Sequence, residues 1–222
     1  MASTTATPPL TATALNGEPL RMTYDEYLNW WDKEAGRRGE WVDGEAIVFM
    51  ATSIKHARMV SFLVLLLGNY LGIRRSGEVI SQDFELRTRE GAAREPDIFV
   101  VLNEHRDRFE ENRLRGAADV VVEVISPDSV ARDRRDKLAE YAAAGVPEYW
   151  VVDPREGRAV FELFTLDQDG YYVPTRPDAD GRITSTVLPG VWIDPAWAAL
   201  DELPDGLRLG LSMAGVELPA GL

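Results

Sequence analysis

Two short apolar runs constrain this chain more than any other feature. Residues 98–102 read Ile-Phe-Val-Val-Leu, and residues 120–125 read Val-Val-Val-Glu-Val-Ile. Neither run alternates with polar residues, as a strand with one solvated face would. Runs of this length and composition are typical of strands that are covered on both faces. We therefore predict a central sheet enclosed by other elements.

The segments before these runs carry their own helix and turn signals. Thr23 begins a capping box that predicts a helix to about residue 34, and Asp43-Gly44 predicts a hairpin over 41–48. Residues 53–71 repeat apolar side chains at helical spacing, and Gly72 is expected to end that helix.

The remaining patterns complete the fold class. They predict a helix at 129–144 and strands at 79–88, 96–102, 119–126, 148–153, 159–166 and 171–175. The segment 103–115 is charged and is expected to form a loop or a short solvated helix. We expect an α/β fold in which helices flank a mixed central sheet, with an αβββαβ core and extra strands at both ends.

The domain organisation follows from length and local composition. Residues 1–20 are rich in Thr, Ala and Pro and are expected to be a disordered tail. Residues 21–200 suffice for a single domain with a sizeable core, and 201–222, rich in Gly, Pro and Leu, are expected to form a C-terminal tail.

Composition excludes several kinds of chemistry. The chain has no cysteine, so disulfides, thiolate metal sites and cysteine nucleophiles are excluded. The only histidines, His56 and His105, count against a zinc centre and leave open a hard cation held by carboxylates. The N-terminus lacks the basic region of a secretory signal, and no apolar run reaches membrane-spanning length, so we expect a cytoplasmic protein with no membrane partner.

Three residues stand out as candidates for a site. Glu123 lies inside the second apolar run, where a carboxylate needs a compensating charge; that charge is either a cation at a functional site or an arginine of the fold. Asp97 opens the first run and could serve a site or simply form a turn. Lys137 shares a helical stripe with Val130 and Tyr141, and could either reach the site or pack its stem on the surface.

Together these three residues compose a recognisable kind of site. Two carboxylates on neighbouring strands can hold Mg²⁺ or Mn²⁺. A nearby lysine can stabilise charge that develops on a phosphate, or orient an attacking water. We therefore expect Asp97, Glu123 and Lys137 to converge on one cleft.

The order of these residues resembles the PD-(D/E)xK nuclease superfamily and, more closely, the Uma-two family of restriction-endonuclease-like proteins. The resemblance covers roughly residues 22–195. Its strongest parts are Pro96-Asp97, the run from Asp119 through Glu123 to Ser129, Arg132-Asp133, Lys137, Tyr141, and the run from Gly145 through Trp150 to Pro154; Asp43-Gly44-Glu45, His56 and Leu188-Pro189-Gly190 support it.

The resemblance implies a phosphodiesterase site that uses a divalent metal, Mg²⁺ or Mn²⁺. Asp97 and Glu123 match the metal-binding acids, and Glu45 matches a further acidic position that is either a ligand or base, or a hairpin residue. The superfamily lysine usually follows the glutamate by two residues, where this chain has Ile125. In the family that it resembles the lysine lies on the following helix, which matches Lys137. His56 is interpreted as a helix-start or core residue.

Two functions remain open at this point. The first is an endonuclease that hydrolyses DNA phosphodiester bonds, acts as a homodimer and uses Mg²⁺ or Mn²⁺. The alternative is a catalytically inactive module on the nuclease fold that binds nucleic acid or a protein partner. Ile125 and the net charge of −13 favour the alternative, because an acidic chain repels nucleic acid unless cations intervene.

Overall fold

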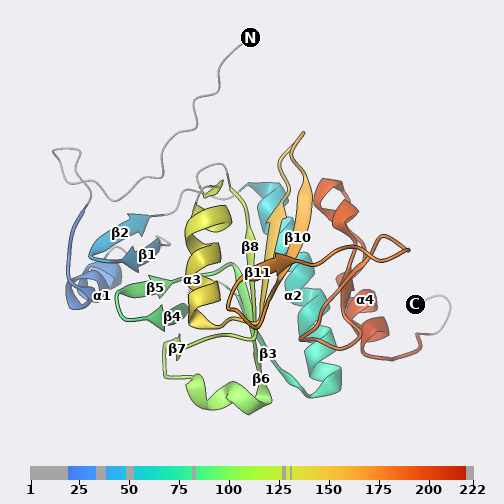
Figure 1. Cartoon of the computed structure of the whole chain (residues 1–222), viewed down its shortest axis with the longest axis horizontal. Coiled ribbons are helices and arrows are strands. Elements are labelled where there is room, and N and C mark those ends of the chain that lie inside the picture. The colour runs from blue at the N-terminus through green and yellow to red at the C-terminus, as the bar shows by residue number, and fades with distance from the viewer. Residues whose placement is uncertain are drawn as a thin grey trace, which may run out of the picture.

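The computed structural model describes residues 20–33, 39–48, 53–81, 84–126, 129–130 and 132–218 (Figure 1). Its centre is a six-stranded sheet in the order β11-β10-β9-β8-β6-β3. The strands are β3 (Gly77–Ser81), β6 (Ile98–Leu102), β8 (Val120–Val124), β9 (Glu148–Asp153), β10 (Val160–Leu166) and β11 (Tyr172–Pro174). The β8–β9 pair is parallel and the other pairs are antiparallel, which confirms the predicted mixed sheet.

The two apolar runs form strands at the middle of this sheet, and the side chains on both faces of these strands are buried. Val120, Val122 and Val124 pack into a cluster with helix α2 (Ile54–Arg74), while Val121 and Ile125 pack into a second cluster on the opposite face. That second cluster includes Tyr141 of helix α3 (Lys137–Ala144), so α2 and α3 cover opposite faces of the sheet (Figure 1).

A second, smaller sheet lies beside α3. Its order is β2-β1-β5-β4-β7, and its strands are β1 (Gly39–Val42), β2 (Glu45–Val48), β4 (Glu85–Arg89), β5 (Ala92–Arg94) and β7 (Arg113–Arg115). The predicted hairpin is confirmed: Asp43 and Gly44 both adopt positive φ, 48° and 89°. The first helix, α1 (Tyr24–Lys33), is confirmed together with its capping box, in which the Thr23 amide donates to Glu26 over 2.8 Å.

The single strand predicted at 79–88 is wrong. It is two strands in different sheets, β3 paired with β6 and β4 paired with β5 and β7. The alternation of side chains is a property of each strand separately and carries no information about its partner, so it continues across the break. Strand β5 was not predicted because three residues are too few to show a period.

Two helix boundaries also differ from the prediction. Helix α2 runs past Gly72 and ends where Arg75 takes a left-handed conformation at φ 50°. The helix predicted from residue 129 begins instead with a π-helical turn, Arg132–Asp136, before α3. Among the described helices, α2 is long and apolar enough to cross a membrane by length and composition, and half of that stretch is buried inside the fold.

The C-terminal segment contains ordered elements. The strands β12 (Ile183–Thr184) and β13 (Trp192–Ile193) pair, 3₁₀ turns form at Asn103–Arg108 and Pro195–Ala199, and helix α4 spans Gly206–Met213. The expectation of a tail over 201–222 therefore needs correction, because α4 packs on α2. A Cβ atom at Gly210 would lie 2.3 Å from the Leu66 carbonyl oxygen. The glycine content that suggested a tail therefore permits close packing of α4 on α2. The predicted N-terminal tail lies outside the described residues except for Leu20.

Candidate active site

Glu123 occupies the middle of the sheet and is nearly inaccessible, with 3% of its surface exposed. It lies near the end of β8, between Val122 and Val124, whose side chains face α2. Its own side chain therefore points to the α3 side. There, Lys137 Nζ donates to Glu123 Oε1 over 2.7 Å and the Tyr141 hydroxyl donates to the same oxygen over 3.0 Å. Among the described residues, Glu123 Oε2 receives no hydrogen bond.

Asp97 lies beside Glu123. It directly precedes β6, and because Ile98 pairs with Val122 in antiparallel register, the next position back is opposite Glu123. The Asp97 carboxylate is held at both oxygens: the Val124 amide donates to Oδ2 over 2.9 Å, and His56 Nε2 lies 3.1 Å from Oδ1.

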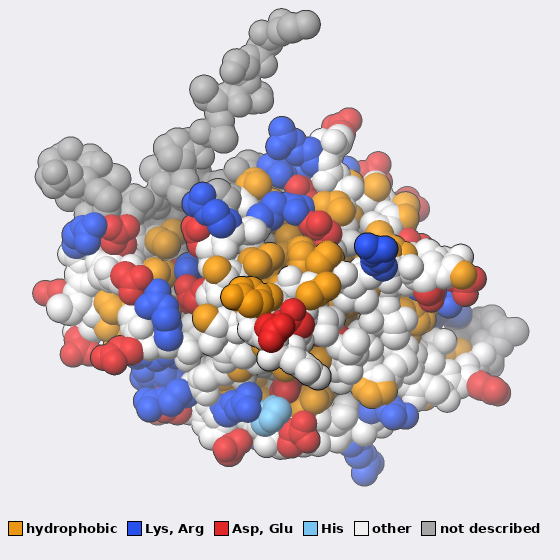
Figure 2. Space-filling view, in the orientation of Figure 1, with side chains coloured by type: hydrophobic (Ala, Val, Ile, Leu, Met, Phe, Trp, Pro, Cys, Tyr) orange, Lys and Arg blue, Asp and Glu red, His pale blue; other side chains and the backbone are white. Residues whose placement is uncertain are grey.

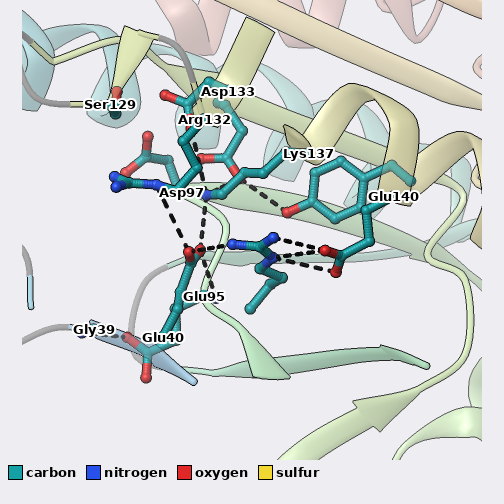
Figure 3. A network of polar contacts seen from close by, with 12 residues as sticks. Gly39, Glu40, Glu95, Asp97, Ser129, Arg132, Asp133, Lys137 and Glu140 are labelled. Atoms are coloured by element: carbon teal, nitrogen blue, oxygen red, sulfur yellow. Dashed lines mark hydrogen bonds and ion pairs between the residues drawn. The ribbon is translucent and has the colours of Figure 1, made fainter. Parts of the chain in front are cut away.

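Lys137 brings a third element to the site. It is the first residue of α3, and only 2% of its surface is exposed. Besides Glu123, its ammonium lies 2.7 Å from Glu40 Oε1 and 3.5 Å from Asp133 Oδ1 (Figure 3). The structure thus places Asp97, Glu123 and Lys137 close together, as the sequence predicted.

A buried arginine, Arg94, ties the small sheet to α3. Arg94 on β5 donates to Glu40 Oε2 over 2.9 Å and to Glu140 of α3 over 2.6 Å (Figure 3). Thr88 on β4 donates to Glu140 over 2.9 Å, and Arg132 lies 3.8 Å from Glu40. The small sheet therefore supplies one wall of the site.

The charges around Glu40 and Glu123 are unequal, and so are their pKa values. Burial alone would raise the pKa of Glu40, but Lys137, Arg94 and Arg132 outweigh it and lower that pKa to about 2. Burial raises the pKa of Glu123 to about 8, and the charge of Lys137 only partly opposes that rise. The neighbouring carboxylates of Asp133, Asp97 and Glu40 raise it further.

Lys137 itself stays charged. Burial lowers the pKa of its ammonium, but Glu123, Glu40 and Asp133 more than reverse that effect and raise it. Burial also raises the pKa of Asp133, against the attraction of Lys137 and Arg132. A single ammonium is thus shared by three buried carboxylates.

The arrangement can be tested for its fit to a divalent cation. Within the described ranges, no three His, Asp or Glu side chains are grouped as a set of metal ligands. The charge balance nevertheless fits one. The network holds five carboxylates, on Glu40, Asp97, Glu123, Asp133 and Glu140, and three cationic side chains, on Arg94, Arg132 and Lys137. Among these described groups the carboxylates outnumber the cationic side chains by two, an excess that protonation of Glu123 or a bound divalent cation would reduce.

Glu45 lies apart from this cluster. It is on β2, forms an ion pair with Arg21 and lines a cavity of about 850 Å³ between the β1–β2 hairpin and α3. Arg94, Arg132 and Glu140 also line that cavity, so it reaches the edge of the buried network. The acid that the hairpin supplies to the network is Glu40.

Three residues of the site were not predicted as site residues: Glu40, Asp133 and His56. Asp133 had a signal, since it precedes Lys137 by four residues and so lies on the same side of a helix. His56 stands three residues after the N-cap Ser53, which explains its interpretation as a helix-start residue. Glu40 had no signal, because nothing local distinguishes it from a surface residue of a hairpin.

Comparison with known proteins supports a nuclease fold. The model of the Uma2 family, "Putative restriction endonuclease", matches residues 24–196. A solved structure of a DUF820 protein from Anabaena variabilis, described as a "putative nuclease", superposes with a TM-score of 0.64 at 18% identity, covering 87% of this chain and 99% of that one. At this identity the likeness shows the fold alone. No functionally curated protein matches the chain.

Proposed function

We propose that this chain, which belongs to the Uma2 family of restriction-endonuclease-type proteins, hydrolyses phosphodiester bonds of DNA with a divalent cation held by Asp97 and Glu123. The observation that carries the proposal is the buried Glu123 directly opposite Asp97, where burial and the neighbouring carboxylates raise the pKa of Glu123. Burying a carboxylate destabilises a protein by several kcal/mol, on the order estimated for desolvated ions. An apolar residue would serve a purely structural role at position 123 better, so the glutamate points to a function.

The donor set suits Mg²⁺ or Mn²⁺. Both cations prefer carboxylate oxygens and retain water ligands, so two protein carboxylates suffice. Glu123 Oε2 and the remaining lone pairs of Asp97 would hold the cation. When bound, it would lower the pKa of a water ligand and neutralise phosphate oxygens.

The chain's own residues supply position and charge. Asp97 is fixed at both oxygens by Val124 and His56, so its geometry is set before any ligand arrives. Lys137 keeps a full positive charge at 2.7 Å from Glu123, where it can stabilise negative charge that develops on a phosphate.

The position of the lysine supports this assignment. Ile125, where the superfamily lysine would stand, is buried in the apolar cluster on the α3 side and reaches no carboxylate described in the structure. Lys137 comes from the following helix and contacts Glu123 directly. The relocated lysine thus meets the glutamate despite its different place in the sequence.

The surface charge bears on DNA as the substrate. Although the chain carries a net charge of −13, the small sheet carries a pair of arginines, Arg87 of β4 in register with Arg115 of β7. Figure 2 shows basic side chains interleaved with acidic ones on this side of the molecule. A phosphate backbone would approach here most readily, with a divalent cation offsetting the acidic remainder.

The test combines DNA cleavage with metal titration. Wild-type protein should cleave plasmid DNA with Mg²⁺ or Mn²⁺ and not with a chelator. Asp97→Ala and Glu123→Ala should lose cleavage and bind Mn²⁺ more weakly by calorimetry, whereas Lys137→Met should bind Mn²⁺ and lose cleavage.

Asp119→Ala provides the matched control. Asp119 also directly precedes a central strand and also accepts a backbone amide, from Leu102 over 2.7 Å, but at the opposite end of the sheet. It should leave Mn²⁺ affinity unchanged. Unaltered Mn²⁺ affinity in both carboxylate variants would remove the basis of the proposal. Metal binding or DNA binding without cleavage would favour the inactive nuclease-fold module instead.

A further inference from the structure

His56 is a buried polar residue that the proposed chemistry does not yet use. It lies in the first turn of α2, where its backbone amide donates to the N-cap hydroxyl of Ser53 over 3.2 Å. Only 4% of its surface is exposed. One ring nitrogen, Nε2, lies 3.1 Å from Asp97 Oδ1, and the other, Nδ1, is buried without a hydrogen-bond partner among the described residues.

This arrangement would destabilise the fold if His56 only filled space in the core. A buried polar atom without a hydrogen-bond partner destabilises the fold, so an apolar side chain of similar size would pack here with less penalty. The contact with Asp97 is the feature that offsets this cost. Hydrogen bonds to an ionised carboxylate contribute more than neutral ones.

The contact also defines the roles of the two groups. The Val124 amide can only donate, so Asp97 Oδ2 accepts from it. With Asp97 ionised, Oδ1 accepts as well, and Nε2 of His56 must carry the proton. The carboxylate is then clamped between the strand β8 and the first turn of α2.

We infer that His56 is a positioning residue for Asp97, which orients the carboxylate of the proposed metal site through its Nε2–H group. Residues that hydrogen-bond to metal ligands fix the orientation of those ligands, and their loss typically weakens metal binding about 10–100-fold. The inference rests on the proposed function, since it assigns a role at the same site.

The fold contains its own control for this role. His105 Nδ1 lies 2.7 Å from Asp119 Oδ1, and Asp119 Oδ2 accepts the Leu102 amide. This second His–Asp pair lies at the opposite end of the central strands, away from Glu123, and uses the other ring nitrogen of a more exposed histidine. A general structural role for such pairs would make the two histidines equivalent.

The experiment measures Mn²⁺ affinity by calorimetry in His56→Leu, His56→Gln and His105→Leu, with folding checked by circular dichroism. His56→Leu removes the donor at similar volume and should weaken Mn²⁺ binding about 10–100-fold. His56→Gln keeps an N–H donor and should recover most of the affinity. His105→Leu should bind like the wild type.

Wild-type Mn²⁺ affinity in folded His56→Leu would overturn this inference and leave the proposed function standing. Failure of the wild type to bind Mn²⁺ would overturn the proposed function and the inference with it. Should His56→Leu not fold, NMR of the wild type decides: the His56 ring Nε2–H signal should shift on Mg²⁺ titration and the His105 ring should not. An unmoved His56 signal would overturn the inference.

Discussion

Lys137 compensates three carboxylates at once, and this sharing explains why two glutamates in one network differ so much. Glu40 has Arg94 and Arg132 as further partners, and its pKa falls to about 2. Burial raises the pKa of Glu123 to about 8, and the neighbouring carboxylates of Asp133 and Asp97 add to the rise. The raised pKa favours the protonated form of Glu123 in the metal-free protein, and binding of the proposed cation would displace that proton.

The raised pKa of Glu123 predicts a pH dependence of stability. Between its ordinary value of 4.5 and about 8, Glu123 is protonated in the folded chain and ionised in the unfolded one. Folding then takes up a proton, so raising the pH across this window lowers the free energy of unfolding. With a chelator present, the free energy of unfolding measured in urea should fall between pH 5 and pH 8, and it should fall more steeply for the wild type than for Glu123→Gln. Parallel slopes would contradict the prediction.

Removal of Lys137 should destabilise the metal-free protein. Lys137→Met leaves three buried carboxylates without their shared ammonium, and breaking buried ion pairs in this way costs about 3–5 kcal/mol. Urea unfolding in chelator measures the change. Lys55→Met is the control: its partner is Asp201 at 2.8 Å on the surface, where solvent screens the pair, so this variant should unfold at nearly the same urea concentration as the wild type. Equal losses in the two variants would show that the buried network does not depend on Lys137.

The sequence allowed part of this site to be predicted. Glu123 could be identified because a carboxylate inside Val-Val-Val-Glu-Val-Ile must be buried, and Asp97 because it opens the adjacent apolar run. Glu40 could not, because its burial depends on the small sheet closing against α3. Glu45 was carried over from the family resemblance, and the sequence alone does not say which acid near the hairpin faces inward.

At the scale of elements, the apolar periods predicted the helices and the central strands, and failed where partners lie far apart in the chain. The β3–β4 break is one case, since pairing with β6 or with β5 depends on long-range contacts. Helix α4 is another. Its glycines look like breakers locally, and their use becomes visible only against the backbone of α2.

Two glycines give the element-scale prediction. Gly210→Ala places a methyl group 2.3 Å from the Leu66 carbonyl oxygen, so α4 must move away from α2, at a cost of about 1–3 kcal/mol. Gly72 lies exposed in α2 with no atom within 4 Å of a Cβ, so Gly72→Ala should stabilise the protein by up to about 1 kcal/mol. Urea unfolding should show a lower free energy of unfolding for Gly210→Ala and a higher one for Gly72→Ala than for the wild type. A neutral Gly210→Ala would contradict the close packing of α4.

At the scale of the whole molecule, the net negative charge opposes the proposed binding of DNA. A net charge of −13 keeps copies of the chain apart and repels DNA, whereas a nuclease must approach a polyanion. The fold partly reconciles the two demands. Its arginines on β4 and β7 lie on the small sheet, whose inner side supplies Glu40 and Arg94 to the site.

The last prediction concerns assembly. Cleavage of both strands of a duplex needs two sites, and soluble oligomers most often supply them by two-fold symmetry, so we expect a homodimer. Because each copy carries a charge of −13, repulsion should oppose pairing at low salt and fade as salt screens it, with a Debye length of about 8 Å near 0.15 M. Sedimentation at micromolar concentration should therefore give a mass near twice 24.7 kDa, with a larger dimer fraction at higher salt. A mass that stays at that of one chain across the salt series would contradict the dimer, and the two strands would then be cut in separate encounters.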